Sequence, residues 1–282
     1  MPEIPDLVYV RRYLHDTLLG RSVTGVEVKQ TVVVRVIGEG SVGDLLRGRK
    51  IESVETRGPF IRFRLSGSFS ILMNLMLAGQ LQHQLSGQKS VGYRCLSILL
   101  DDDSRINLCD SKRMAKVYIV PDSGTQGVPR LEDQGIDVLS ERFTLDRFQA
   151  LARTNRRKQV RVFLTDQRSL SAIGNAYADE ILYEARIHPK TFVGKLRDAD
   201  IEALFNAVRS VLQWGVEQVE KAKQPIHIKV RDHMRVRNRK GKSCERCGTT
   251  IRREGVRGYD VFFCPACQPA TRELFLDWRK IP

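Results

Sequence analysis

Cys244-Glu-Arg-Cys247 and Cys264-Pro-Ala-Cys267 are two Cys-x-x-Cys motifs separated by the length of one short hairpin. Paired motifs at this spacing are typical of a tetrahedral zinc site in which every cysteine supplies a thiolate. A redox dithiol pair is the alternative, but redox motifs usually occur singly and beside a βαβ pattern. We therefore predict a finger over residues 243–268 that binds one structural Zn²⁺.

The sequence around these cysteines is strongly basic. Residues 221–257 contain thirteen Lys or Arg, against only Asp232, Glu245 and Glu254 as acidic residues. A zinc-stapled hairpin within this much positive charge indicates a module that binds a polyanion, although a purely structural staple remains an alternative. The formal charge of the whole chain, +14 at pH 7, leaves nucleic acid, an acidic membrane surface or an acidic protein as partners.

Length and composition narrow the class of protein further. The chain has 282 residues, of which 41% are hydrophobic, enough for two domains and a small module. No apolar run approaches the roughly 18 residues of a membrane span, and no signal peptide opens the chain. We expect no membrane partner and an intracellular protein, cytoplasmic or nucleoid-associated. Cys95 and Cys109 are then expected to be buried free thiols rather than a disulfide.

Periodicity divides the chain into a β-rich first part and a helical second part. Residues 6–19 have helical spacing, and the short apolar or alternating runs that follow predict antiparallel strands. These runs cover residues 22–36, 50–55, 60–65, 71–77, 95–100 and 105–109. Turn-forming residues 121–129 indicate a connection between domains. Helical patterns follow over residues 145–153, 159–164, 176–185 and from Asp198 onward.

We therefore predict an α+β multidomain fold. Its parts are an N-terminal helix and antiparallel β-sandwich (1–120), a linker (121–138), a helical domain (139–242), the zinc finger (243–268) and a C-terminal tail (269–282).

Three features occur together in an order that resembles one protein family. They are the start Met1-Pro-Glu-Ile-Pro-Asp6, the segment Gly174-Asn-Ala-Tyr-Ala-Asp-Glu180, and the four-cysteine finger. The chain resembles the formamidopyrimidine-DNA glycosylase and endonuclease VIII family of base-excision repair enzymes from residue 1 to about residue 268. The resemblance implies a helix-two-turn-helix domain between the sandwich and the finger. It also implies a monomer that binds double-stranded DNA containing a damaged base or an abasic site.

The resemblance implies chemistry at the N-terminus. Once Met1 is removed, Pro2 presents a secondary amine, and an α-amine with an ordinary pKa near 8 is partly neutral at physiological pH. This amine would attack the sugar C1′, expel the damaged base and form an iminium that promotes β- and δ-elimination of the two phosphates. Glu3 would move the protons. Asp6 replaces a family glutamate and is either a supporting carboxylate or a helix cap. A flexible terminus is the alternative for Pro2 and Glu3.

The family also implies residues that contact DNA. Asn175 resembles an asparagine that binds phosphate at a helix N-terminus, and a simple helix cap is its alternative. Leu77 resembles a residue that fills the place of an extruded nucleotide, and the loop of residues 110–114 offers Lys112, Arg113 and Met114 for a similar purpose. Core packing is the alternative for the apolar Leu77 and Met114.

This chain departs from the family pattern at several positions. Pro59 stands where a phosphate-binding lysine is usual, so that Arg57 would have to compensate. In the finger, Tyr259 takes the place of a phosphate-binding arginine, and Arg257 lies two residues earlier. The stretch between residues 217 and 239 is also short for the family's flexible loop, which predicts a more open pocket.

The sequence is therefore compatible with three functions. The first is a bifunctional DNA glycosylase and abasic-site lyase for damaged, chiefly oxidised, bases. The second is a protein on the same scaffold that binds damaged DNA or abasic sites without excision, as the departures at Asp6, Pro59 and Tyr259 suggest. The third is a zinc-ribbon regulator without chemistry, which leaves the N-terminal motif and residues 174–185 unexplained.

Overall fold

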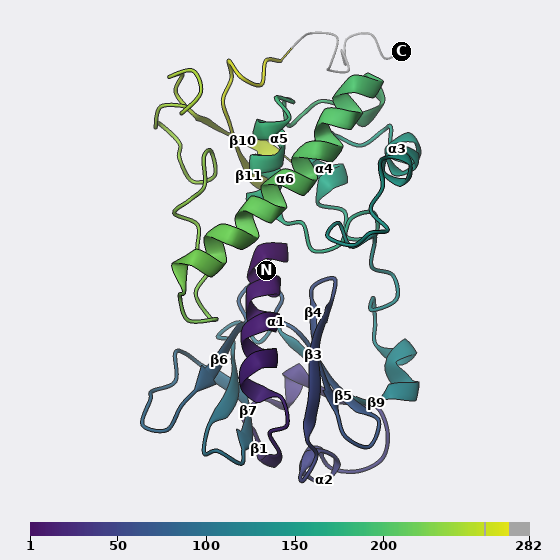
Figure 1. Ribbon diagram of the computed structural model, residues 1–282, viewed down its shortest axis with the longest axis vertical. Helices are drawn as coiled ribbons and strands as arrows, with labels where there is room; N and C mark the ends of the chain where they lie inside the picture. Colours follow the sequence, from purple (N-terminus) through teal and green to yellow (C-terminus); the bar gives the residue numbers. More distant parts are fainter. Residues whose placement is uncertain (257, 271–282) are drawn as a thin grey trace. The chain divides into compact units, whose positions relative to one another are not determined.

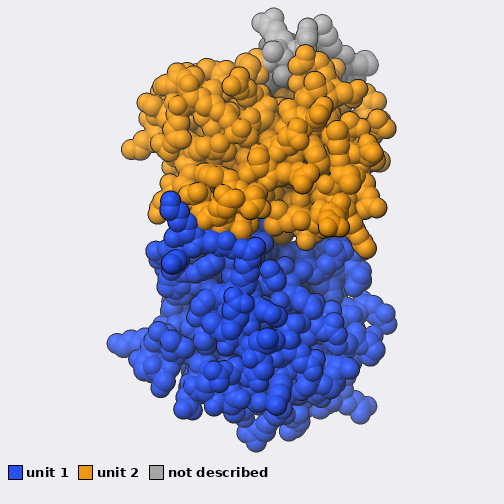
Figure 2. Space-filling view, in the orientation of Figure 1, with its two compact units in different colours: residues 1–134, 219–230 blue, residues 135–218, 231–282 orange. Residues whose placement is uncertain are grey.

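The computed structural model describes residues 1–256 and 258–270, which belong to two compact units. Unit 1 comprises Met1–Gln134 and Val219–Val230, and unit 2 comprises Gly135–Gln218 and the residues from Arg231 onward (Figure 2). Unit 1 therefore includes a segment that follows most of the helical part of the sequence. The division after Gln134 lies within the stretch 121–138, and most of the predicted tail 269–282 lies outside the described residues.

Unit 1 begins with helix α1 (Ile4–Leu18), because a capping box at Glu3 and Asp6 closes its first turn. The chain leaves the helix through Gly20, whose positive φ of 80° favours glycine. Leu7, Val10, Leu14 and Leu18 recur at helical spacing, and all four are buried. This apolar stripe packs α1 against the neighbouring strand β3 (Figure 1).

Two sheets form the rest of unit 1 (Figure 1). The five-stranded sheet has the order β2 (Val34–Val36), β9 (Lys116–Pro121), β5 (Phe69–Asn74), β4 (Phe60–Leu65) and β3 (Ile51–Arg57). The four-stranded sheet has the order β1 (Val23–Val28), β7 (Arg94–Leu100), β8 (Arg105–Cys109) and β6 (Gln80–Gln84). Short helical turns η1 (Thr31–Val33), α2 (Val42–Leu46) and η2 (Asp122–Gly127) connect or follow strands.

The sheets are antiparallel as predicted, except that β2 and β9 are parallel neighbours. The sequence did not indicate β6, since its residues Gln-Leu-Gln-His-Gln contain a single aliphatic side chain. Strand β9 ends at Pro121, a residue that sequence reasoning assigned to the connection. Cys95 and Cys109 are buried and free, as expected.

Unit 2 combines helices with a small hairpin. Its helices are α3 (Leu145–Thr154), α4 (Val160–Leu164), α5 (Asn175–Glu184), the turn η3 (Val193–Lys195) and α6 (Asp198–Ala222), whose last residues count with unit 1. The hairpin pairs β10 (Arg252–Val256) with β11 (Tyr259–Phe263). Tyr183 of α5, Ile251 and Phe262 share one buried cluster with Cys244 and Cys264, so the finger and α5 have a common core. Within residues 1–256 and 258–270, no helix is long and apolar enough to span a membrane.

Candidate functional site

The start of α1 holds the N-terminal residues in fixed positions. Pro2, Glu3 and Asp6 are all buried. The backbone N–H of Glu3 donates to Asp6 Oδ2 at 2.9 Å, and the Glu3 carboxylate accepts from the backbone N–H of Asp6. Glu3 is thus the N-cap residue, and Asp6, the third residue of the helix, completes the capping box, so the terminus is anchored by two hydrogen bonds.

A small cavity of about 20 Å³ lies beside this terminus. Its wall includes Pro2, with Asp6 and Tyr9 of α1, and His227 and Lys229 of the second segment of unit 1. The terminal amine of Met1 lies 3.5 Å from the carbonyl oxygen of Leu77. Burial and the positive charge of Lys229 lower the pKa of this amine from 8.0 to about 6, although Glu3 and Asp6 act in the opposite direction. An amine in this environment is mostly neutral at pH 7.

The loop of residues 74–79, between β5 and β6, presents Leu77. Asn74 Oδ1 accepts from the backbone N–H of Met76, and the Gly79 N–H donates to the Leu75 carbonyl oxygen, so the loop is tightly closed. A Cβ atom on Gly79 would lie only 2.4 Å from that oxygen. Leu77 is 62% exposed, so it does not pack in the core of unit 1. An exposed apolar side chain on a rigid loop is a suitable wedge.

A second rigid loop carries Lys112, Arg113 and Met114. The buried Asp110 carboxylate accepts from the backbone N–H groups of Lys112, Met114 and Ala115 at 2.7–2.9 Å. Lys112 and Arg113 are exposed and Met114 is half-buried, so only Met114 retains a partial packing role. Both cations are therefore available at the surface of unit 1.

The turn between β3 and β4 contains Pro59, which stands where the family resemblance leads us to expect a lysine. Pro59 is buried, while the neighbouring Arg57 is exposed and donates from Nη2 to the Gln134 carbonyl oxygen at 3.3 Å. Arg57 is thus an exposed cation beside this turn, and its contact with a phosphate stays a prediction.

Asn175 is the first residue of α5 in unit 2. Gly174 is the N-cap residue, so Asn175 does not take the simple capping position that was its alternative. Its Oδ1 accepts a hydrogen bond from Arg161 Nη2 at 3.0 Å. This contact orients the Asn175 side chain at the positive end of the helix, where anions are favoured.

Sequence reasoning assigned no role to Asp179, which organises the same region. Its fully buried carboxylate pairs with Arg161 at 3.1 Å and with Arg237 at 2.8 Å, and it accepts from the Phe262 N–H of β11. Burial raises the pKa of Asp179 to about 6, against the opposing effect of the two arginines. The carboxylate is therefore ionised at neutral pH and links α5 to the finger.

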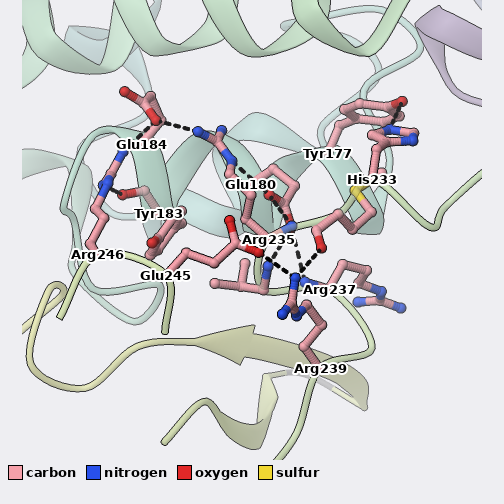
Figure 3. Close-up of polar contacts among 12 residues, drawn as sticks. Tyr177, Glu180, Tyr183, Glu184, His233, Arg235, Arg237, Arg239, Glu245 and Arg246 are labelled. Atoms are coloured by element: carbon pink, nitrogen blue, oxygen red, sulfur yellow. Dashed lines mark hydrogen bonds and ion pairs between the residues drawn. The ribbon is translucent and has the colours of Figure 1, made fainter. Parts of the chain in front are cut away.

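Glu180 binds the backbone that leads into the finger (Figure 3). Its buried carboxylate accepts from the N–H groups of Arg235, Val236 and Arg237 at 2.9–3.0 Å. One turn later, Glu184 forms ion pairs with Arg235 and Arg246. These contacts fix the basic approach segment against α5.

The four cysteines converge at one point of the finger. Their sulfur atoms all lie within 4.8 Å of one another, with Cys247 3.5 Å from Cys264 and Cys244 3.8 Å from Cys267. Four thiolates at about 2.3 Å from a tetrahedral Zn²⁺ would lie close to these separations, so the donor set fits the metal. The hydroxyl of Tyr183 contacts Cys244 Sγ at 3.2 Å and can donate to that thiolate.

The remaining finger residues lie at the hairpin tip. Tyr259 is 58% exposed and opens β11, which leaves its ring available for a ligand. Arg257 lies outside the described residues, so its predicted phosphate contact stays a prediction.

We predict that Cys264→Ser loses the bound zinc and unfolds the finger, because structural zinc supplies about 10–16 kcal/mol in small modules. Metal analysis of the purified chain should find one zinc in the parent and almost none in the variant, together with weaker DNA binding. Cys109→Ser is the matched control, since this buried free thiol lies in β8 of unit 1. A Cys264→Ser chain that keeps one zinc would contradict the assignment.

Family models match nearly the whole chain. The formamidopyrimidine-DNA glycosylase N-terminal domain matches residues 1–117, and the H2TH domain of the same enzymes matches residues 134–225. A zinc finger found in FPG and IleRS matches residues 241–270.

Curated relatives and solved structures agree with these matches. The formamidopyrimidine-DNA glycosylase of Symbiobacterium thermophilum is 30% identical over 99% of this chain and 93% of its own length. That of Pelotomaculum thermopropionicum is 29% identical over 95% of this chain and 99% of its own. Lactococcus lactis Fpg, solved with abasic-site DNA, has the same fold, with a TM-score of 0.86 at 22% identity over 95% of this chain and 100% of that one. The chain belongs to the formamidopyrimidine-DNA glycosylase family and carries its four-cysteine site for one structural zinc ion.

Proposed function

We propose that this protein is a bifunctional DNA glycosylase and abasic-site lyase that removes damaged, chiefly oxidised, bases from double-stranded DNA. The observation that carries the proposal is the position of the chain start: Pro2 is buried together with Glu3 and Asp6, and burial and Lys229 lower the pKa of the adjoining Met1 amine to about 6. Relatives that match almost end to end are named formamidopyrimidine-DNA glycosylases, and solved neighbours were bound to DNA with an abasic site or an oxidised pyrimidine.

The chemistry begins after removal of Met1, which frees the Pro2 nitrogen. The neutral amine forms a bond to the sugar C1′ as the bond from C1′ to the damaged base breaks, and the base leaves with a proton. Ring opening then gives an iminium, which acidifies the C2′ proton. Loss of this proton eliminates the 3′ phosphate, and a second elimination releases the 5′ phosphate. Water finally hydrolyses the iminium and restores the amine.

Glu3 is the proton carrier in this proposal, because its carboxylate is the nearest to the nitrogen in sequence. Its capping contact with the Asp6 N–H is weak enough to be exchanged for a substrate contact, since a single cap is worth about 1 kcal/mol. Asp6 keeps the Glu3 backbone in place through its own hydrogen bond. Asp6 is therefore a supporting carboxylate rather than the main acid.

The remaining site residues hold the DNA. Lys112, Arg113 and Arg57 on unit 1 supply positive charge, and Asn175 supplies a polar contact at a helix N-terminus. Leu77, with the half-buried Met114, would fill the space of the extruded nucleotide. In the finger, zinc is structural: it holds the hairpin that presents Tyr259. A role on chromosomal DNA implies association with the nucleoid.

The presence of Pro59 favours a second function, in which the protein acts mainly on abasic sites. Without a lysine at this turn, the nucleotide to be excised loses one phosphate contact, and base excision requires a firmly held, flipped nucleotide. A protein that binds abasic sites and cleaves them, but excises bases slowly, would fit this departure. Elimination at a preformed abasic site needs only the amine, Glu3 and access to C1′.

We expect borohydride to trap the protein covalently on abasic-site DNA only when the chain starts at Pro2. A fusion cleaved to leave Pro2 as the first residue should give the trapped complex. The same chain with one added residue before Pro2 should give none above background, because the nitrogen is then an amide without a basic lone pair. Both forms should bind the DNA with similar affinity. Equal trapping of the two forms would show that the nucleophile is another amine.

DNA affinity should fall steeply with salt and depend little on sequence, since the proposed contacts are to phosphates. Replacing Lys112 with Met should reduce the slope of log affinity against log salt by about 0.9, the value of one lost phosphate contact. Lys50→Met is the control, because this exposed lysine precedes β3 at the end opposite Arg57. A slope unchanged by Lys112→Met would remove this lysine from the DNA-binding surface.

A further inference from the structure

At the end of α6 the chain returns to unit 1, where two hydrogen bonds and one ion pair hold it. Residues Val219–Val230 belong to unit 1, although they follow the helical part of the sequence. The Tyr9 hydroxyl donates to the Gln224 carbonyl oxygen at 2.8 Å, and Gln80 Nε2 donates to the His227 carbonyl oxygen at 3.4 Å. Arg12 of α1 forms an ion pair with Glu220. Three contacts, two of them from α1, thus hold this returning segment, which we define as residues 219–230.

The returning segment places Lys229 at the N-terminus. Lys229 lines the same 20 Å³ cavity as Pro2 and Asp6, and its positive charge acts on the Met1 amine. Pro2 is itself buried and lines this cavity, so removal of Met1 places the new terminal amine beside it. Lys229 is exposed and Met1 is half-buried, so solvent screens the interaction between the two cations in part.

We propose that Lys229 is a positioning residue that keeps the nucleophilic amine of Pro2 in its neutral form. This inference rests on the proposed function of the same site. A fixed positive charge beside an amine disfavours a second positive charge there, so Lys229 makes protonation of the nucleophile unfavourable. Sequence reasoning gave Lys229 no role of its own, because this residue reaches the N-terminus only through the returning segment.

Other titratable groups around the amine also affect whether it is protonated. On α1, Glu3 and Asp6 favour the protonated amine, and Tyr9 is neutral at physiological pH. On the returning segment, His227 and Lys229 line the cavity, and burial lowers the pKa of His227, so that His227 is also neutral. Lys229 is therefore the positive charge that offsets the two carboxylates. Burial and Lys229 together lower the pKa of the Met1 amine to about 6, against the two carboxylates.

The test is the pH dependence of covalent trapping on preformed abasic-site DNA, with cyanoborohydride as the reductant and the chain beginning at Pro2. Lys229→Met should move the acidic limb of the trapping rate upward by about one pH unit. Trapping should then fall by up to about tenfold on the acidic limb, and the loss should disappear at high pH, where the amine is neutral in both proteins. Lys229→Arg should follow the parent curve, because it keeps the positive charge.

Lys223→Met is the matched control, since Lys223 lies on the same returning segment but lines a different cavity, together with Tyr13. Its curve should superimpose on that of the parent. The inference is overturned by a Lys229→Met curve equal to the parent, or by a loss that is the same at every pH. Complete loss of trapping in both Lys229 variants would instead identify Lys229 as the nucleophile. Absence of trapping in the parent chain would refute the proposed function itself, and the inference with it.

Discussion

The capping box at the start of α1 is the constraint on which the proposed chemistry depends. A nucleophile at a chain terminus is useful only when the terminus is held, and free chain ends are ordinarily mobile. Here the Glu3 N–H donates to Asp6, and the Asp6 N–H donates to Glu3, so the two residues before the helix share its order. Because α1 also packs its apolar stripe on β3, the amine is positioned by the core of unit 1.

In unit 2, buried carboxylates hold separate parts of the chain together. Asp179 and Glu180 are adjacent on α5, yet both are fully buried, which is costly unless every oxygen has a partner. Asp179 receives Arg161, Arg237 and the Phe262 N–H, while Glu180 receives three backbone N–H groups of the approach to the finger. Together with zinc, they join helix α5 and the finger hairpin into one body.

Local sequence signals predicted much of this structure. The paired cysteine motifs, the apolar stripe of α1 and the helical patterns that became α3–α6 are short-range features, and each is confirmed. Strand β6 was missed because its polar residues acquire strand geometry only by pairing with β8. The parallel pairing of β2 with β9 joins strands far apart in sequence, which no local pattern encodes.

The sequence likewise predicted only those parts of the candidate site that are neighbours along the chain. Pro2, Glu3 and Asp6 are neighbours in sequence, so motif reasoning could bring them together. In the sequence, Lys229 is one of thirteen basic residues between residues 221 and 257. It lines the same cavity as Pro2 because hydrogen bonds hold the returning segment to α1 and β6. Arg161 and Asp179 likewise meet only in the folded chain. Contacts of this kind require the tertiary structure.

The most direct test of the account is to identify the nitrogen that carries the sugar. The reduced covalent complex with abasic-site DNA would be digested with protease and nuclease, and the modified peptide sequenced by mass spectrometry. The account predicts a single sugar remnant on the α-nitrogen of Pro2, in a peptide that has lost Met1. A remnant on the Lys229 side chain, or on the α-nitrogen of a retained Met1, would contradict it.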